Sequence, residues 1–76
     1  MRYRWEHGAR EQWWLVGDDN SIGVAIIERP YHPEPPYTRY TISGRLVGHG
    51  QEFTSLVEAR RAAEDIATAA GHAIAV

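Results

Sequence analysis

The chain has 76 residues, and we expect residues 1–76 to form a single small domain, because separate hydrophobic cores need a longer chain. Three Trp and four Tyr supply large apolar surfaces to bury, which argues against disorder. The absence of cysteine excludes disulfides and thiolate metal sites, and the net charge of −2 argues against a typical nucleic-acid-binding domain, which is basic.

Strand and turn patterns alternate over the first part of the chain. Alternating charged and aromatic residues predict a strand over Arg2–Glu6, and aromatic and β-branched residues predict another over Gln12–Val16. The β-branched run Ile22–Glu28 predicts a third strand. The turn-forming cluster Gly17–Ser21 lies between the last two, so they are expected to form a hairpin.

All four prolines of the chain lie in the segment Arg29–Pro36. Proline lacks an amide donor and fixes φ, so this segment cannot be a central strand. We expect a stiff connector, although its Pro-x-x-Pro spacing is also that of a polyproline II ligand for an aromatic groove. Tyr31, His32 and Tyr37 are candidate partner-binding residues in this loop.

Three further segments have strand character. Patterning resumes over Tyr37–Ser43, with Tyr40 and Ile42 on one face of the strand. Gln51–Phe53 is expected to be a short returning strand, and His72–Val76 to be a short edge strand.

An amphipathic helix is expected over Ser55–Ala70. Ser55 and Glu58 have the spacing of a capping box, in which each side chain accepts a hydrogen bond from a backbone amide. Gly71 is placed to end the helix in the left-handed conformation. Small side chains allow a helix to approach a sheet closely, so the strands must supply the bulky core residues. The apolar stripe of this helix comprises Leu56, Ala59, Ala63, Ile66, Ala67 and Ala70.

These elements predict an α+β fold, a three- to five-stranded antiparallel sheet with one C-terminal helix packed on one face. Trp13 and Trp14 are neighbours on a strand and therefore point to opposite faces, of which a single helix covers only one. We expect the uncovered face to bind a protein partner or a second copy of the chain, unless the Pro-rich loop or a chain end folds over it. Candidate residues for this contact are Trp13, Trp14, Val16 and Ile27.

The sequence contains no pattern typical of catalysis or of a metal site. No two of the four histidines are three or four residues apart, whereas zinc sites usually contain such pairs. The turn Asp18–Asn20 lacks the closing glutamate of a calcium loop. Ser43, His49 and Asp65 are residue types of a Ser–His–acid catalytic triad, but no nucleophile elbow or similar motif accompanies them. We therefore expect no cofactor, no metal and no catalytic residue, and an enzyme is only a distant alternative.

A nucleic-acid-binding surface is the main alternative. Three strands followed by Glu52–Ala59, which opens a helix, resemble the small β-β-β-α DNA-binding domains of phage integrases over Gln12–Ala70. The resemblance implies a sheet that lies in the major groove of DNA. The net negative charge and the long Pro-rich loop depart from that pattern. The candidate arginines are Arg2, Arg4, Arg39 and Arg45, interleaved in the sequence with Tyr3, Trp5 and Tyr40.

Our prediction is a non-catalytic small binding module that acts through an open, aromatic sheet face. It is expected to be cytoplasmic and not membrane-bound, since no apolar run approaches the ~18 residues of a spanning helix. A short chain that begins at Met resembles small accessory proteins of bacteria and phages in size.

Overall fold

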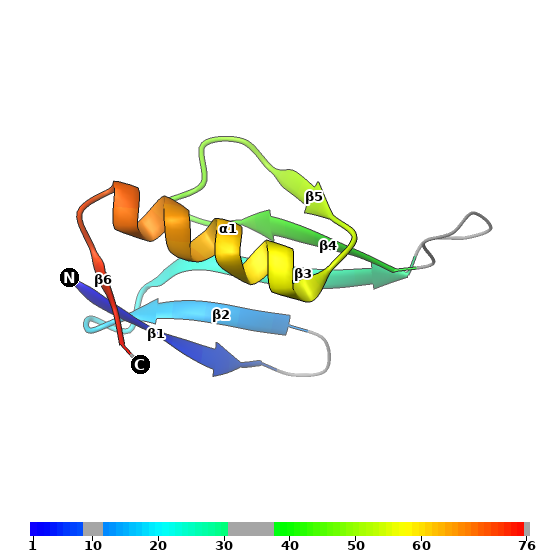
Figure 1. The fold of residues 1–76 in the computed structure, drawn as a ribbon. Coiled ribbons are helices and arrows are strands. Elements are labelled where there is room, and N and C mark those ends of the chain that lie inside the picture. Colours follow the sequence, from blue (N-terminus) through cyan, green and yellow to red (C-terminus); the bar gives the residue numbers. More distant parts are fainter. Residues whose placement is uncertain (9–11, 31–37, 76) are drawn as a thin grey trace.

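The computed structural model describes residues 1–8, 12–30 and 38–75 (Figure 1). Within these residues the chain forms a sheet of six strands and one helix, and the helix lies across one face of the sheet. The elements are β1 (Arg2–His7), β2 (Gln12–Gly17), β3 (Ile22–Pro30), β4 (Thr38–Ser43), β5 (Gln51–Phe53), α1 (Leu56–Ala69) and β6 (Ala73–Ile74).

The strand order is β5-β4-β3-β2-β1-β6, and each neighbouring pair is antiparallel except β1 and β6, which are parallel. The predicted α+β fold with a C-terminal helix is confirmed. The prediction of a purely antiparallel sheet of three to five strands is wrong, because the sheet is mixed and has six strands. The reason is the crossover through α1, which carries the chain from β5 at one edge to β6 at the other (Figure 1).

The Pro-rich segment begins later than predicted. β3 continues through Arg29 and Pro30, which pair with Arg39 and Thr38 of β4. A proline at the last position of a strand interrupts little of the ladder. The rest of that segment, with Tyr31 and His32, lies outside the described residues, and so does Tyr37.

The start of α1 differs from the prediction and its end agrees with it. Ser55 occupies the N-cap position with an extended backbone, but its side chain makes no capping hydrogen bond, so the predicted capping box is absent. At the other end, Gly71 has φ +89°, as predicted. The amide of Gly71 donates to Thr68 O at 2.9 Å and that of His72 donates to Ala67 O at 3.0 Å. These two bonds define a Schellman motif.

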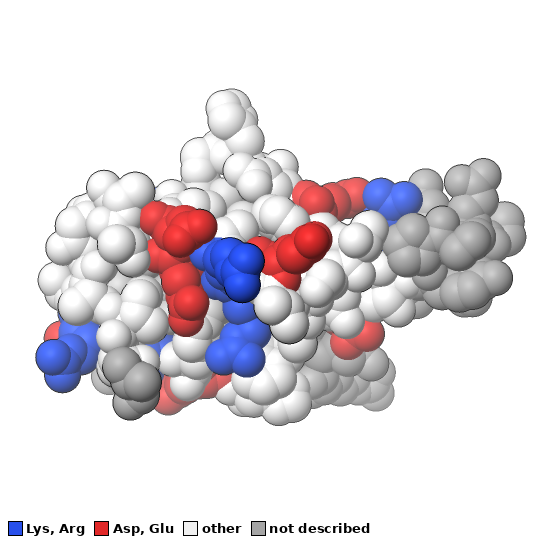
Figure 2. Space-filling view, in the orientation of Figure 1, with Lys and Arg blue, Asp and Glu red and all other residues white. Residues whose placement is uncertain are grey.

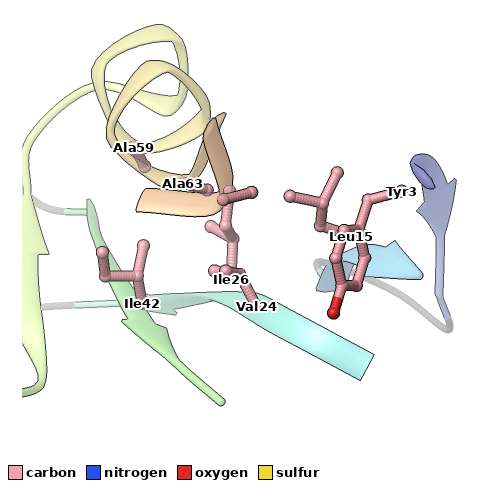
Figure 3. Packing of buried hydrophobic residues seen from close by; sticks show 8 residues of the cluster. Tyr3, Leu15, Val24, Ile26, Ile42, Ala59 and Ala63 are labelled. Carbon is pink, nitrogen blue, oxygen red and sulfur yellow. The ribbon is translucent and has the colours of Figure 1, made fainter. Parts of the chain in front are cut away.

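The core lies between α1 and the sheet, and it follows the predicted division between small and bulky residues (Figure 3). The helix contributes alanines, and the strands contribute one tyrosine and four aliphatic side chains. Every member is fully buried, and the set is Tyr3, Leu15, Val24, Ile26, Ile42, Ala59, Ala63 and Ala67.

Tyr3 is the largest fully buried side chain of this core. Its ring passes over two glycines, because a Cβ atom at Gly23 would lie 2.7 Å from Tyr3 Cε1 and one at Gly17 would lie 3.1 Å from it. Both glycines therefore leave the space that the ring occupies. The alternating pattern of β1 thus buries Tyr3, so this residue is not part of the predicted basic and aromatic surface.

No helix in the described part of the chain is long and apolar enough to cross a membrane. Figure 2 shows acidic and basic side chains mixed on the side of the molecule that carries α1.

Candidate functional site

The sheet face opposite α1 carries three of the residues predicted to contact a partner. Trp13 and Leu15 pack toward the helix, so Trp14 and Val16 point away from it. In the register of the sheet Trp14 is opposite Ala25, and Gln12 is opposite Ile27. Trp14, Ala25 and Ile27 therefore form the apolar centre of this open face. All three are partly buried.

The chain itself covers part of the open face. Val16 is only 4% exposed and pairs with Arg4 on one side and Ile22 on the other. The Arg4 guanidinium donates to Gly17 O at 3.2 Å and to Asn20 Oδ1 at 3.2 Å, which holds it beside Val16. Val16 is therefore less accessible than the sequence suggested.

Trp14 also has an intramolecular neighbour. A Cβ atom at Gly8 would lie 2.8 Å from Trp14 Cζ2, so the indole rests against the glycine that follows β1. The Trp14 ring on the open face is therefore in contact with the chain's own backbone at Gly8, although α1 does not cover it.

Charged residues flank the apolar centre on two sides. On β1, Arg4 and Glu6 form an ion pair at 3.2 Å. Across the sheet, Arg39 of β4 and Glu52 of β5 form another at 3.5 Å. Each flank thus carries both signs of charge, so neither one attracts a strongly charged partner of one sign.

Trp13 belongs to an aromatic cluster on the helix side. Its ring stacks on His7 with centroids 4.3 Å apart. The Arg60 guanidinium lies 5.3 Å from the Trp13 ring centroid and 5.0 Å from that of Trp5. Trp5 Nε1 donates to Glu64 Oε2 at 2.7 Å. Trp13 therefore contributes to the packing of α1, and Trp14 is the tryptophan of the open face.

A groove of about 720 Å³ adjoins this cluster, between α1, β1 and the C-terminal segment. Trp5, Ile74 and Ala75 provide apolar walls. Helix side chains provide polar ones, among them Arg60, Glu64, Asp65 and Thr68. No local pattern in the sequence predicts this groove, because Trp5 is far along the chain from the helix that begins at Leu56.

The four arginines proposed for nucleic-acid binding do not share one surface with the aromatic residues. Alternation puts Arg4 and Arg39 on the open face, while their aromatic neighbours Tyr3, Trp5 and Tyr40 pack toward α1. The backbone amide of Arg2 donates to Asp18 Oδ2 at 3.3 Å, and Arg2 is exposed.

Arg45 lies in the turn after β4 and not on a strand. Its Nη2 donates to Tyr3 Oη and to Ser21 Oγ, both at 3.1 Å. The hydrogen bond to Tyr3 raises the pKa of Arg45 above its ordinary value. In the same network, hydrogen bonds from the Ser21 hydroxyl and amide lower the pKa of Asp19 below 3.8. This network joins the turn after β4 and the turn between β2 and β3 to Tyr3 of the core. Arg45 therefore has a structural role in the fold.

The described residues contain no group of three His, Asp or Glu side chains that could hold a metal ion. Comparison with protein-family models, curated proteins and solved structures finds no match to this chain.

Proposed function

We propose that this protein is a non-catalytic binding module that associates with a second copy of itself through the open sheet face. The observation that supports this proposal is the apolar centre of Trp14, Ala25 and Ile27, which α1 does not cover. Apolar surface left in water forgoes ~25 cal/mol for each Å² that a partner would bury. A contact on this face therefore recovers free energy that the single chain leaves unused.

The charges that flank this centre favour a second copy over a partner of one sign. A two-fold axis through the centre of the face brings the Arg4–Glu6 pair of one chain near a flank of the other chain. Each flank carries both signs of charge, so Arg4 and Glu6 of one chain can pair with Glu52 and Arg39 of the other. Isologous pairing also needs only one surface on each chain.

We extend the proposal to a small accessory role in the cytoplasm. A chain without cysteine suits a reducing compartment, and a binding module needs no cofactor.

The experiment is the molar mass in solution, measured by sedimentation equilibrium over a range of protein concentrations. The wild type is expected to form a dimer, and Ile27→Lys to be a monomer with an unchanged circular dichroism spectrum, because it places a charge in the centre of the contact. Val57→Lys is the matched control, since Val57 is 66% exposed on α1, away from this face. A monomeric wild type, or a dimer that persists in Ile27→Lys, contradicts the proposal.

A further inference from the structure

The register of the sheet places four side chains of the open face at the corners of a nearly square cell. Trp14 of β2 is opposite Ala25 of β3, and Gln12 is opposite Ile27 in the next row of the same face. Neighbouring strands lie ~4.8 Å apart and the two rows lie ~6.8 Å apart, because side chains on one face recur at every second residue. Trp14 and Ile27 therefore occupy one pair of diagonal corners, and Ala25 and Gln12 occupy the other pair.

When two copies of this cell meet face to face, the polarity of Gln12 selects one direction for the two-fold axis. An axis parallel to the strands sets the Gln12 amide on Ile27 of the other chain, and an axis perpendicular to them sets it on Trp14. An axis along the Trp14–Ile27 diagonal sets it on Ala25. Each of these buries an amide against an apolar side chain, which costs free energy. Only the axis along the Ala25–Gln12 diagonal sets Gln12 against its own copy, where the two amides can hydrogen-bond.

The charged residues of the two flanks select the same axis. The Arg4–Glu6 pair lies beside one of the two corners that this axis exchanges, and the Arg39–Glu52 pair lies beside the other. The axis therefore lays the first pair of one chain over the second pair of the other chain, so unlike charges meet. An axis along the other diagonal lays each pair on its own copy, which sets Arg4 against Arg4 and Arg39 against Arg39.

We propose that the two open faces of the dimer pack with their strands nearly perpendicular, so that Trp14 of each chain contacts Ile27 of the other. This inference rests on the proposed dimer and adds its geometry. A diagonal axis of a nearly square cell turns the strands of one sheet across those of the other, and orthogonal packing is one of the two arrangements that face-to-face sheets adopt. The two Ala25 side chains meet at the axis, where their small size lets the larger Trp14 and Ile27 side chains come into contact.

The first test measures contacts between chains in the wild type. An equal mixture of ¹³C-labelled and unlabelled protein is examined by an isotope-filtered NOE experiment, which removes the signals that arise within one chain. This filter is needed because Trp14 and Ile27 are also diagonal neighbours in the same sheet. The expected result is a set of interchain NOEs between the Ile27 methyl groups and the Trp14 indole protons.

The second test mixes two variants that carry opposite charges at the proposed contact. Trp14→Glu and Ile27→Lys are each expected to be monomers, and circular dichroism checks that both are folded. An equal mixture is expected to form a heterodimer, which native mass spectrometry identifies by its mass. In that heterodimer the introduced glutamate meets the introduced lysine, and the second contact between Trp14 and Ile27 is intact. The control mixes Trp14→Glu with Val57→Lys, whose lysine lies on α1, and no heterodimer is expected.

The outcomes separate this geometry from the dimer itself. Interchain NOEs that join Trp14 to Ala25 or to Trp14 of the other chain would overturn the proposed packing and leave the dimer standing. A mixture of folded variants that stays monomeric would overturn the packing as well. A wild type that is monomeric in sedimentation equilibrium would overturn the dimer and this geometry together.

Discussion

The indole nitrogen of Trp5 donates a 2.7 Å hydrogen bond to the carboxylate of Glu64, and this contact joins residues 59 positions apart in the chain. Arg60, one helical turn before Glu64, lies over the same indole at 5.0 Å. The helix thus holds the Trp5 ring from two sides, and this arrangement fixes α1 against β1 and forms one wall of the groove.

We predict a coupling free energy of about 1 kcal/mol between Trp5 and Glu64, because the hydrogen bond is charge-assisted and only partly buried. It is measured by chemical denaturation of Trp5→Phe, Glu64→Ala and the double variant. A cycle between Trp13→Phe and Glu64→Ala is the control, since Trp13 makes no hydrogen bond to Glu64. Equal coupling in the two cycles would show that the bond adds nothing specific.

Ala63→Asp should destabilise the domain by roughly 3–5 kcal/mol, because it buries an unpaired charge between α1 and the sheet. A domain of this size has little stability to spare, so this variant is expected to be largely unfolded. Val57→Asp introduces the same side chain at an exposed position of the first helical turn, where the helix dipole favours an acid. Thermal melts compare the two, and similar melting temperatures would mean that the buried stripe is misplaced.

Two glycines with positive φ allow two penalties of an added side chain to be compared. At Gly71 the penalty is backbone strain alone, and at Gly44 it is backbone strain together with steric overlap. Gly71→Ala should cost about 1 kcal/mol, since φ is +89° and no atom lies within 4 Å of the added Cβ. Gly44→Ala should cost roughly 2–4 kcal/mol, because φ is +129° and the added Cβ would lie 2.7 Å from Gly23 O. Urea unfolding measures the free energy of unfolding of both variants. A larger loss of stability in Gly71→Ala than in Gly44→Ala would contradict the prediction.

The stability of the fold should depend on Asp19 in acid. Hydrogen bonds from Ser21 lower the pKa of Asp19 in the folded chain below its ordinary value of 3.8. The carboxylate therefore contributes stability that is fully present above pH 3.8 and is lost as the pH falls through the lowered pKa. An NMR titration of the Asp19 carboxyl carbon should show the lowered pKa directly. Ser21→Ala should bring it back toward the ordinary value, and an unchanged titration would exclude Ser21 as the cause.

Nucleic-acid binding, the alternative drawn from the phage integrase resemblance, has its own test. We expect no complex tighter than micromolar with duplex DNA at physiological salt, because the net charge is −2 and Arg39 is paired with Glu52. A gel shift at nanomolar protein would support the alternative. In that case Arg39→Ala together with Arg45→Ala should weaken the complex and flatten its salt dependence.

Local sequence determined most of the elements. Alternation and β-branched runs located β1 to β4 within a few residues, since a strand that is buried on one face shows its period in the sequence. The stripe of small residues and Gly71 located α1 and its end for similar local reasons. The predicted capping box is absent because a favourable spacing in the sequence does not by itself cause the Ser55 side chain to accept a hydrogen bond from a helix amide.

The tertiary structure alone decided which face each residue occupies. Alternation separates Trp13 from Trp14, but only the crossover of α1 onto the Tyr3 and Leu15 side assigns Trp13 to the helix and Trp14 to the open face. The contact of Trp5 with Glu64 and the pairing of β6 with β1 depend on the same crossover. These features join distant parts of the chain, and local propensity carries no information about such pairs because their free energy appears only when the sheet and the helix pack together.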